Sequence, residues 1–209
     1  ASGLKTAGYR LGYVGKWHVN AYKDPKAFGF EQYVSLGDYP PYRKQLGVPF
    51  PPESNNYLMP TAGVDRIPVE HCRAAFLADH AMRMMEEFTQ DNEHPFFIRL
   101  DFHGPHAPMV IPEPYASMYD PASIPPHPNF DDPLTGKPAV QSIKRKHWGT
   151  EFMTWEDWQP LLARYYGEVS LIDDQVARVL GKLEQLGEQD NTIVIYMTDH
   201  GDTMGAHKI

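Results

Sequence analysis

The sequence predicts an α/β fold in which helices cover a mostly parallel sheet. Apolar stretches of strand length alternate along the chain with longer stretches whose apolar residues recur every three or four positions, a pattern typical of strand–helix–strand units. The strand stretches are apolar at nearly every position, as expected when helices bury both faces of a parallel sheet. At 209 residues the chain has the size of one large domain or part of a bigger one.

The first part of the chain predicts a helical turn, a strand, a long loop and a helix. Residues 2–8 indicate a helical turn closed by Gly8, because glycine commonly ends helices. YRLGYVGKWH (9–18) indicates a strand. The segment from about residue 20 to residue 68 is rich in Pro, Gly, Tyr and Asn, and its apolar residues show little periodicity. We therefore expect an irregular excursion there. From about Val69 the apolar spacing predicts a helix with one buried face.

The second part predicts strand, loop, helix and strand. PFFIRLDF (95–102) indicates a buried strand, and a Pro- and Asp-rich excursion follows at about 109–157. The strongest helical pattern runs from Leu162 to Leu183 and stops before Gly187. NTIVIYMTD (191–199) predicts a closing strand.

Composition excludes several classes of protein. The net charge of -8 argues against a nucleic-acid-binding surface, and no apolar run approaches the roughly 20 residues that cross a bilayer. The N-terminal residues carry no apolar signal-peptide core. The single cysteine, Cys72, excludes an internal disulfide and is expected to be a buried thiol. The cellular compartment stays open.

The first predicted strand ends in a possible anion site. Lys16 and His18 are two residues apart, so in an extended segment their side chains point the same way. An ammonium and an imidazole side by side can hold an anion such as sulfate or phosphate. The alternative is a surface lysine and a hydrogen-bonded histidine beside a packed Trp17.

The other two strand ends carry histidine and carboxylate. His103 and His106 lie beside Pro105 and Pro108, which restrict the backbone. A histidine held in this way can donate a proton or ligate a metal, although a turn with exposed histidines fits equally well.

Asp199 and His200 can both bind a divalent ion, but two ligands do not complete a metal site. Asp202 is expected to cap the next turn. Together the strand ends predict an anion pocket next to a metal.

Three segments resemble the sulfatase family, in the family's order. LKTAGYRLGYVGKWHVN is similar to the segment that follows the sulfatase nucleophile, and FFIRLDFHGPHAP to the strand with a Pro-His-x-Pro element. YYGEVSLIDDQVARVLGKLEQLGEQDNTIVIYMTDHGD resembles the helix and strand that end in the second half of the metal site. The resemblance implies an alkaline phosphatase-like three-layer sandwich, with residues 1–209 as part of the catalytic domain, incomplete at both ends.

The resemblance also implies roles for individual residues. Lys16 and His18 match the sulfate-binding lysine and histidine, and His106 matches the histidine near the leaving-group oxygen. Asp199 and His200 match the metal-binding pair, for which Ca²⁺ is the usual ion and Mg²⁺ or Mn²⁺ occurs in some relatives. His103 receives no role from the resemblance.

The chain departs from the family pattern at the nucleophile. Sulfatases use a formylglycine made within a Cys/Ser-x-Pro-x-Arg motif, and this sequence contains no such motif. Cys72 is followed by Arg73 and Ala74, so it does not match. We therefore expect the formylglycine, and the paired aspartates of the metal site, before Ala1, and we expect no turnover by residues 1–209 alone. Lys208 is not assigned as the family's further sulfate-binding lysine.

The implied activity is hydrolysis of a small-molecule or glycan sulfate monoester, in which the metal favours the nucleophile and His106 protonates the departing oxygen. One alternative is a phosphodiester or phosphonate monoester hydrolase of the same superfamily, although such relatives tend to lack the Lys-Trp-His trio. Another is a non-catalytic homologue that binds sulfated ligands. The sequence identifies neither the substrate nor the oligomeric state.

Overall fold

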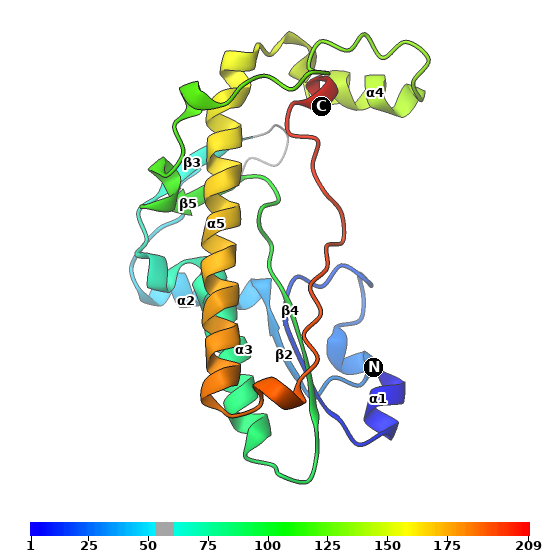
Figure 1. Ribbon diagram of the computed structural model, residues 1–209, viewed down its shortest axis with the longest axis vertical. Coiled ribbons are helices and arrows are strands. Elements are labelled where there is room, and N and C mark those ends of the chain that lie inside the picture. Colours follow the sequence, from blue (N-terminus) through cyan, green and yellow to red (C-terminus); the bar gives the residue numbers. More distant parts are fainter. Residues whose placement is uncertain (53–60) are drawn as a thin grey trace. The chain divides into compact units, whose positions relative to one another are not determined.

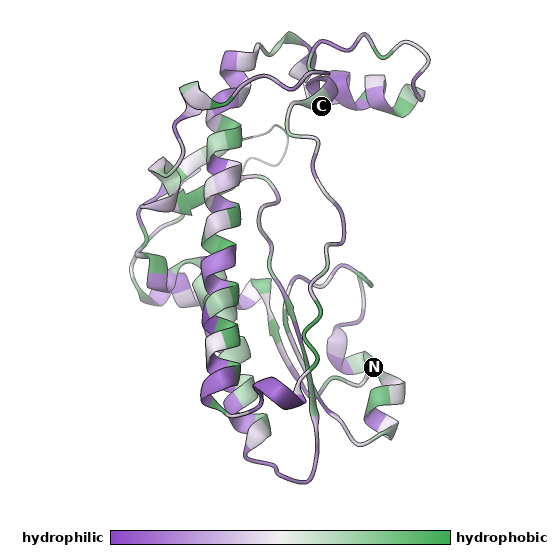
Figure 2. Cartoon of the chain, in the orientation of Figure 1, coloured by the Kyte–Doolittle hydropathy of each residue, from purple (hydrophilic) through white to green (hydrophobic). Residues whose placement is uncertain are grey.

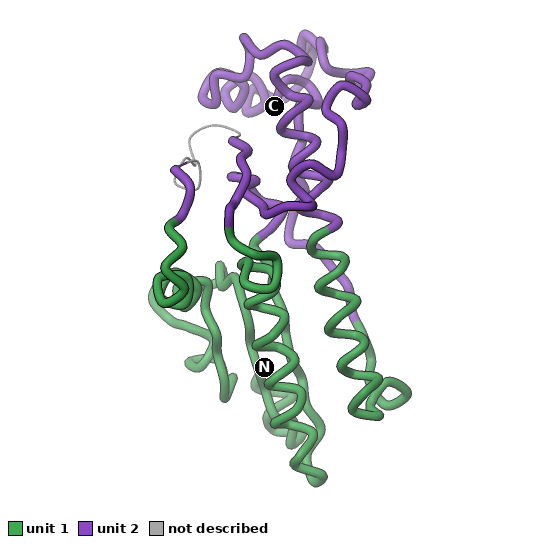
Figure 3. Tube along the Cα trace, turned by 90° about the vertical axis from the view of Figure 1, so that its left-hand side faces the viewer, with its two compact units in different colours: residues 1–49, 67–103, 171–194 green, residues 50–66, 104–170, 195–209 purple. Residues whose placement is uncertain are grey.

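The computed structural model describes residues 1–52 and 61–209 (Figure 1). The chain divides into two compact units, coloured separately in Figure 3. Unit 1 comprises residues 1–49, 67–103 and 171–194, and unit 2 comprises residues 50–66, 104–170 and 195–209. Each unit is built from three separate segments of the chain.

Unit 1 contains a parallel sheet with the strand order β2-β1-β4, formed by β1 (Arg10–Gly15), β2 (Gln32–Ser35) and β4 (Phe96–Asp101). The middle strand, β1, is buried along almost its whole length. Gly15 pairs in register with Asp101, so β1 and β4 end together at one edge of the sheet. The strands expected at the start of the chain and at 95–102 are confirmed, and so is the α/β class with parallel strands. The second of these strands, β4, was expected to be buried but is only half-buried, with Arg99 exposed.

Helix α3 (Arg73–Thr89) packs on β1 and β4 through a face of regularly spaced apolar residues. A Cβ on Gly12 would lie 2.9 Å from the Sδ atom of Met84, so the glycine lets the helix approach the sheet closely. Cys72 precedes the helix, and its buried Sγ accepts a hydrogen bond from the Ala75 amide at 3.5 Å. The expectation of a buried thiol is therefore confirmed.

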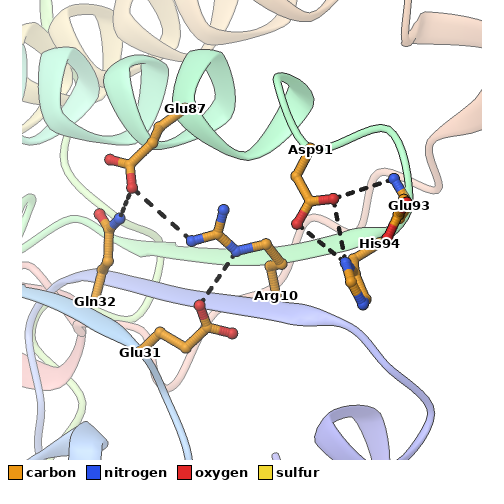
Figure 4. Close-up of polar contacts among 7 residues, drawn as sticks. All are labelled: Arg10, Glu31, Gln32, Glu87, Asp91, Glu93 and His94. Atoms are coloured by element: carbon orange, nitrogen blue, oxygen red, sulfur yellow. Dashed lines mark hydrogen bonds and ion pairs between the residues drawn. The ribbon is translucent and has the colours of Figure 1, made fainter.

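A polar network ties α3 to the strands where they begin (Figure 4). The Arg10 guanidinium pairs with Glu31 at 3.2 Å and with Glu87 at 3.9 Å, and Gln32 donates to Glu87 at 2.6 Å. These groups are partly exposed, so each ion pair contributes at most about 1 kcal/mol. The network lies at the edge of the sheet where the strands start, whereas Lys16 follows the edge where they end.

The excursion expected at 20–68 is more ordered than predicted. It contains β2, helix α2 (Tyr39–Gln45) and strand β3 (Ala62–Asp65). Arg43 of α2 is only 1% exposed because its guanidinium donates to the carbonyl groups of Val48 and Pro49. The Arg43 side chain thus gives these two carbonyl groups the hydrogen-bond donors that a helix or a neighbouring strand would otherwise supply. Residues 53–60 of the excursion lie outside the described residues.

Unit 2 pairs β3 with β5 (Met109–Pro112) in parallel and contains helix α4 (Ala139–His147). The excursion expected at 109–157 is thus also partly regular. The core of the unit is a cluster of apolar side chains, formed by Met109, Ile124, Phe130, Trp155, Trp158, Leu161, Leu162 and Ala163.

Helix α5 (Trp155–Gln185) confirms the long helix and begins seven residues earlier than its first periodic apolar residue, Leu162. Its residues up to Ser170 belong to unit 2 and those from Leu171 to unit 1.

The short helix α1 (Ser2–Thr6) and the positive φ of +83° at Gly8 confirm the predicted first turn. The short 3₁₀ helices are η1 (Pro25–Phe28), η2 (Leu36–Asp38), η4 (Val69–His71), η5 (Tyr115–Ser117), η6 (Pro121–Ser123), η7 (Thr150–Phe152), η8 (Gln189–Asn191) and η9 (Ala206–Lys208).

The predicted closing strand is absent from the described fold. Residues 192–198 have no regular structure, and none of the described strands pairs with them. Their apolar side chains face solvent, with Ile193 89% and Tyr196 84% exposed, and Figure 2 shows a hydrophobic stretch there. A strand needs a neighbouring backbone to satisfy its amide and carbonyl groups, so an apolar composition alone is not enough to form a strand.

Within residues 1–52 and 61–209, every helix is too short or too polar to span a bilayer.

Candidate functional site

Lys16 occupies a fixed position just after β1. Gly15 has a φ of +108°, and a Cβ at this position would overlap the Asp101 carbonyl oxygen, so the strand can end this way only at glycine. The Lys16 amide then donates to the same carbonyl at 3.0 Å. The glycine turn therefore places Lys16 at the edge of the sheet where β1 and β4 end.

Partly buried polar contacts hold this strand end. The Tyr13 hydroxyl contacts the Asp101 carboxylate and the Lys16 carbonyl, the latter at 2.7 Å. Arg99 Nε lies 2.9 Å from both oxygens of Asp101. Burial, followed by the hydrogen bond and negative charge of Asp101, raises the pKa of Tyr13 well above its usual value. Tyr13 consequently stays protonated, and its single O–H lies within reach of both acceptors, which links the Lys16 carbonyl to the Asp101 side chain at the end of β4.

The segment after Lys16 is held by an aromatic cluster. The Trp17 indole N–H donates to the Lys23 carbonyl at 2.7 Å, and its ring lies 5.3 Å from the rings of Tyr13 and Phe28. His18 is exposed, whereas Lys16 is half-buried. An anchored backbone with one half-buried ammonium and one exposed imidazole is suited to binding an anion.

The structure gives His103 a partner that the sequence did not reveal. Arg73 Nη1 lies 3.3 Å from His103 Nδ1, and the guanidinium stands 5.6 Å from the ring centre of Tyr39. Arginine can only donate, so Nδ1 accepts and the proton of the neutral ring lies on Nε2. Arg73 opens α3, thirty residues before His103, and no sequence signal links the two.

His106 and His200 come together within unit 2. Their ring centres are 5.9 Å apart, with an angle of 72° between the ring planes. His106 Nδ1 lies 2.7 Å from the Ala107 carbonyl, and His200 Nδ1 lies 3.1 Å from the Gly201 carbonyl. In both neutral rings Nδ1–H is therefore the donor to the backbone, which leaves the lone pair on Nε2.

Asp199 and His200 fit part of a metal shell. The Asp199 Oδ2 and His200 Nε2 atoms are 3.7 Å apart, close enough for both to contact one divalent ion at about 2.3 Å. The His200 tautomer supports this arrangement, because a metal-binding histidine commonly donates its other ring N–H to a carbonyl. Their side chains are 60% and 48% exposed. The described residues contain no group of three or more ligands, so this pair supplies only part of a site.

Sequence reasoning also missed the packing around the turn before His106. A Cβ on Gly104 would overlap the carboxylate of Glu168 on α5, so the glycine lets this side chain lie close against the turn. The Tyr165 hydroxyl lies one turn earlier on the same helix. Burial, then the charges of Asp202 and Glu168, raises the pKa of Tyr165. Gly104 and Glu168 are 64 residues apart, and Tyr165 and Asp202 are 37 residues apart, which explains why no local pattern predicted these contacts.

Lys208 is engaged within the fold. Its Nζ atom pairs with Asp131 at 2.9 Å and lies 4.9 Å from the centre of the Phe130 ring. These contacts direct the amine toward the 127–132 segment and agree with leaving Lys208 out of the site.

Comparison with known proteins identifies the family. The Sulfatase family model matches residues 1–209. The multifunctional alkaline phosphatase superfamily protein PehA of Trinickia caryophylli is 29% identical over 69% of the chain and 30% of its own length. The arylsulfatase of Clostridium perfringens is 32% identical over 56% of the chain and 24% of its own length. The chain thus spans less than a third of either relative.

The fold has a similar counterpart among solved structures. The phosphonate monoester hydrolase SpPMH of Silicibacter pomeroyi superposes with a TM-score of 0.70 at 26% identity, over 98% of the chain and 47% of its own length. Its likeness agrees with the parallel strands and flanking helices described above. Because the family model covers all 209 residues, the chain belongs to the sulfatase family.

Proposed function

We propose that the whole protein hydrolyses sulfate monoesters and that this chain supplies the anion-binding residues, a proton donor and part of the metal site. The observation that carries the proposal is the anchored end of β1, where the Gly15 turn and the Tyr13 and Asp101 contacts hold Lys16 beside the exposed His18. A lysine and a histidine on a fixed backbone can stabilise the charge of a transferring sulfuryl group.

His106 is proposed as the residue that protonates the leaving-group oxygen. Its Nδ1 atom is held by the Ala107 carbonyl at 2.7 Å, so Nε2 is the nitrogen that gains and loses the catalytic proton. Histidine suits this role because its ordinary pKa lies near neutrality. The backbone contact holds the ring in one orientation during proton transfer.

Asp199 and His200 are proposed to hold a divalent metal ion, with Ca²⁺ the first expectation and Mg²⁺ or Mn²⁺ the alternatives. Such an ion would neutralise sulfate oxygens and favour the ionised nucleophile. The nucleophile that the family resemblance implies is a formylglycine, and Cys72 does not take that role, because it is buried and caps α3.

Phosphonate monoester hydrolysis is the second candidate, favoured by the structural likeness to SpPMH. The two activities can be separated with the full-length protein. We expect a higher kcat/KM for 4-nitrophenyl sulfate than for a 4-nitrophenyl phosphonate monoester. The reverse ranking would favour the second candidate, and no hydrolysis of either ester would favour a homologue that only binds sulfated ligands.

A further inference from the structure

Helix α4 carries a local excess of positive charge on an acidic chain. Residues 136–149 contain Lys137, Lys144, Arg145 and Lys146 and no acidic residue, whereas the whole chain has a net charge of -8. The catalytic residues proposed above include none of these cations. Three of them, Lys144, Arg145 and Lys146, lie on the short helix α4 itself, and this clustering calls for a separate explanation.

The helix uses only one of its faces for packing. At about 100° per residue, Gln141, Arg145 and Trp148 share one side, and all three are half-buried. Arg145 acts structurally, since its guanidinium donates to the carbonyls of His207 at 2.9 Å and Asp132 at 2.8 Å. The cation of Arg145 is thus directed into the fold.

The rest of the helix surface is exposed and carries lysine and aliphatic side chains. Val140 and Ile143 are 55% and 63% exposed, and Lys144 and Lys146 are also exposed. The helical spacing places Val140, Ile143 and Lys144 on one stripe. Lys146 lies about 160° around the helix from Lys144, on the other side of Ile143. Neither lysine has an ion-pair partner among residues 1–52 and 61–209. We call this exposed part of α4, with Val140, Ile143, Lys144 and Lys146, the α4 surface. Lys137 precedes the helix and lies 3.9 Å from the Asp132 carboxylate, so it is left out.

The α4 surface is braced by the segment that follows the proposed metal ligands. Besides the contact of Arg145 with the His207 carbonyl, the Thr150 hydroxyl donates to the Lys208 carbonyl at 2.6 Å and the His207 amide to the Asn129 carbonyl at 3.2 Å. All these residues, together with His106 and His200, belong to unit 2. The α4 surface is consequently part of the same compact unit as three of the proposed catalytic and metal-binding residues, His106, Asp199 and His200.

We propose that the α4 surface binds the anionic chain of a sulfated polysaccharide, away from the ester that is hydrolysed. The proposal rests on the function proposed above, because a sulfatase acting on a polymer meets further sulfate groups on the same chain. Exposed lysines on an acidic protein provide the complementary charge, and the aliphatic side chains of Val140 and Ile143 can pack on the C–H faces of sugar rings.

A lipid surface fits these observations less well. Stable membrane anchoring requires more buried apolar surface than one myristoyl chain supplies. The two exposed aliphatic side chains of α4 offer far less apolar surface than that. An acidic protein partner would need a broader apolar centre than this stripe provides. The balance of two lysines and two aliphatic residues favours the polysaccharide.

The test measures how the full-length protein binds fluorescently labelled dextran sulfate. We expect the double variant Lys144→Glu/Lys146→Glu to bind about tenfold more weakly, with a smaller dependence of affinity on salt than the wild type. Its kcat and KM for 4-nitrophenyl sulfate should stay unchanged. The matched control, Lys5→Glu/Lys44→Glu, makes the same change in charge at exposed positions in unit 1 and should bind like the wild type.

Equal affinities of the wild type and the Lys144/Lys146 variant would overturn the proposal, and so would an equal loss in the control variant. Lysine-dependent binding to phosphatidylserine vesicles without binding to dextran sulfate would overturn it in favour of a membrane. If the wild type fails to hydrolyse 4-nitrophenyl sulfate but binds dextran sulfate through α4, the proposed function fails and the α4 surface stands.

Discussion

At the scale of single residues, the structure assigns the ring nitrogens of the site histidines. His106 and His200 both direct Nδ1 at the carbonyl of the next residue, whereas His103 turns Nδ1 toward Arg73. The first two rings therefore present Nε2 for proton transfer or metal binding, and the third carries its proton there. Residue types suggest a role for a histidine, but only the contacts of one nitrogen show what the other can do.

Replacing His106 tests its role as a proton donor. In the full-length protein, His106→Gln should lower kcat for phenyl sulfate by about 100-fold or more. The loss should be smaller for 4-nitrophenyl sulfate, whose leaving group needs less protonation. Steady-state kinetics with the two esters measure the difference. His94→Gln, at an exposed histidine paired with Asp91, serves as the control, and equal losses on both esters in His106→Gln would refute the assignment.

The sequence pointed to Lys16, His18, His106, Asp199 and His200 because each follows an apolar stretch and because their motifs resemble one family. It could not point to Arg73, Glu168 or Tyr165. These residues reach their partners through helix packing, and nothing in their own neighbourhoods distinguishes them from ordinary helix residues.

At the scale of elements, the end of β1 depends on Gly15. A methyl group there would overlap the Asp101 carbonyl, and the φ of +108° disfavours any other residue. Gly15→Ala should therefore lower the free energy of unfolding by more than about 2 kcal/mol. Gly181→Ala is the matched control, since a Cβ on Gly181 of α5 meets no atom within 4 Å and should stabilise the protein by about 0.5–1 kcal/mol. Urea denaturation of both variants decides; equal effects would contradict the role of the turn.

Helix α3 carries a histidine that should make stability sensitive to pH. Burial, then the positive charge of Arg83, lowers the pKa of His80, against the opposing charges of Asp38 and Asp79. The unfolded chain thus binds the proton more tightly, so stability is lost as pH falls below about 6.5.

His80→Gln should reduce the loss of unfolding free energy between pH 7.5 and 5.5, measured by urea denaturation. His147→Gln, at an exposed position on α4, should leave the wild-type loss intact. An unchanged slope in the His80 variant would show that other groups govern this pH range.

Long periodic helices were predictable, and short strands were not. Helices α3 and α5 follow from apolar spacing over several turns, while β2, β3 and β5 have four residues each and present too few side chains for an alternating pattern. The prediction for residues 192–198 was wrong in the opposite way, because a strand was expected there and none forms. Their composition favours a strand, but strand formation depends on a neighbouring backbone, which local sequence does not contain.

At the scale of the whole molecule, the central proposal is that Lys16, at the end of the buried parallel strand β1, binds the anion that the whole protein hydrolyses. Family membership rests on the match to all 209 residues. The activity of the whole protein remains a proposal, because the chain spans 30% of PehA and 24% of the arylsulfatase.

The most direct measurement is kcat/KM for 4-nitrophenyl sulfate in the full-length wild type and in Lys16→Ala. Loss of this ammonium should remove stabilisation of the transferring sulfuryl group and lower kcat/KM by about 100-fold or more. Lys23→Ala, at an exposed lysine in the same loop, should stay within about threefold of the wild type. An unchanged rate in Lys16→Ala would contradict the account.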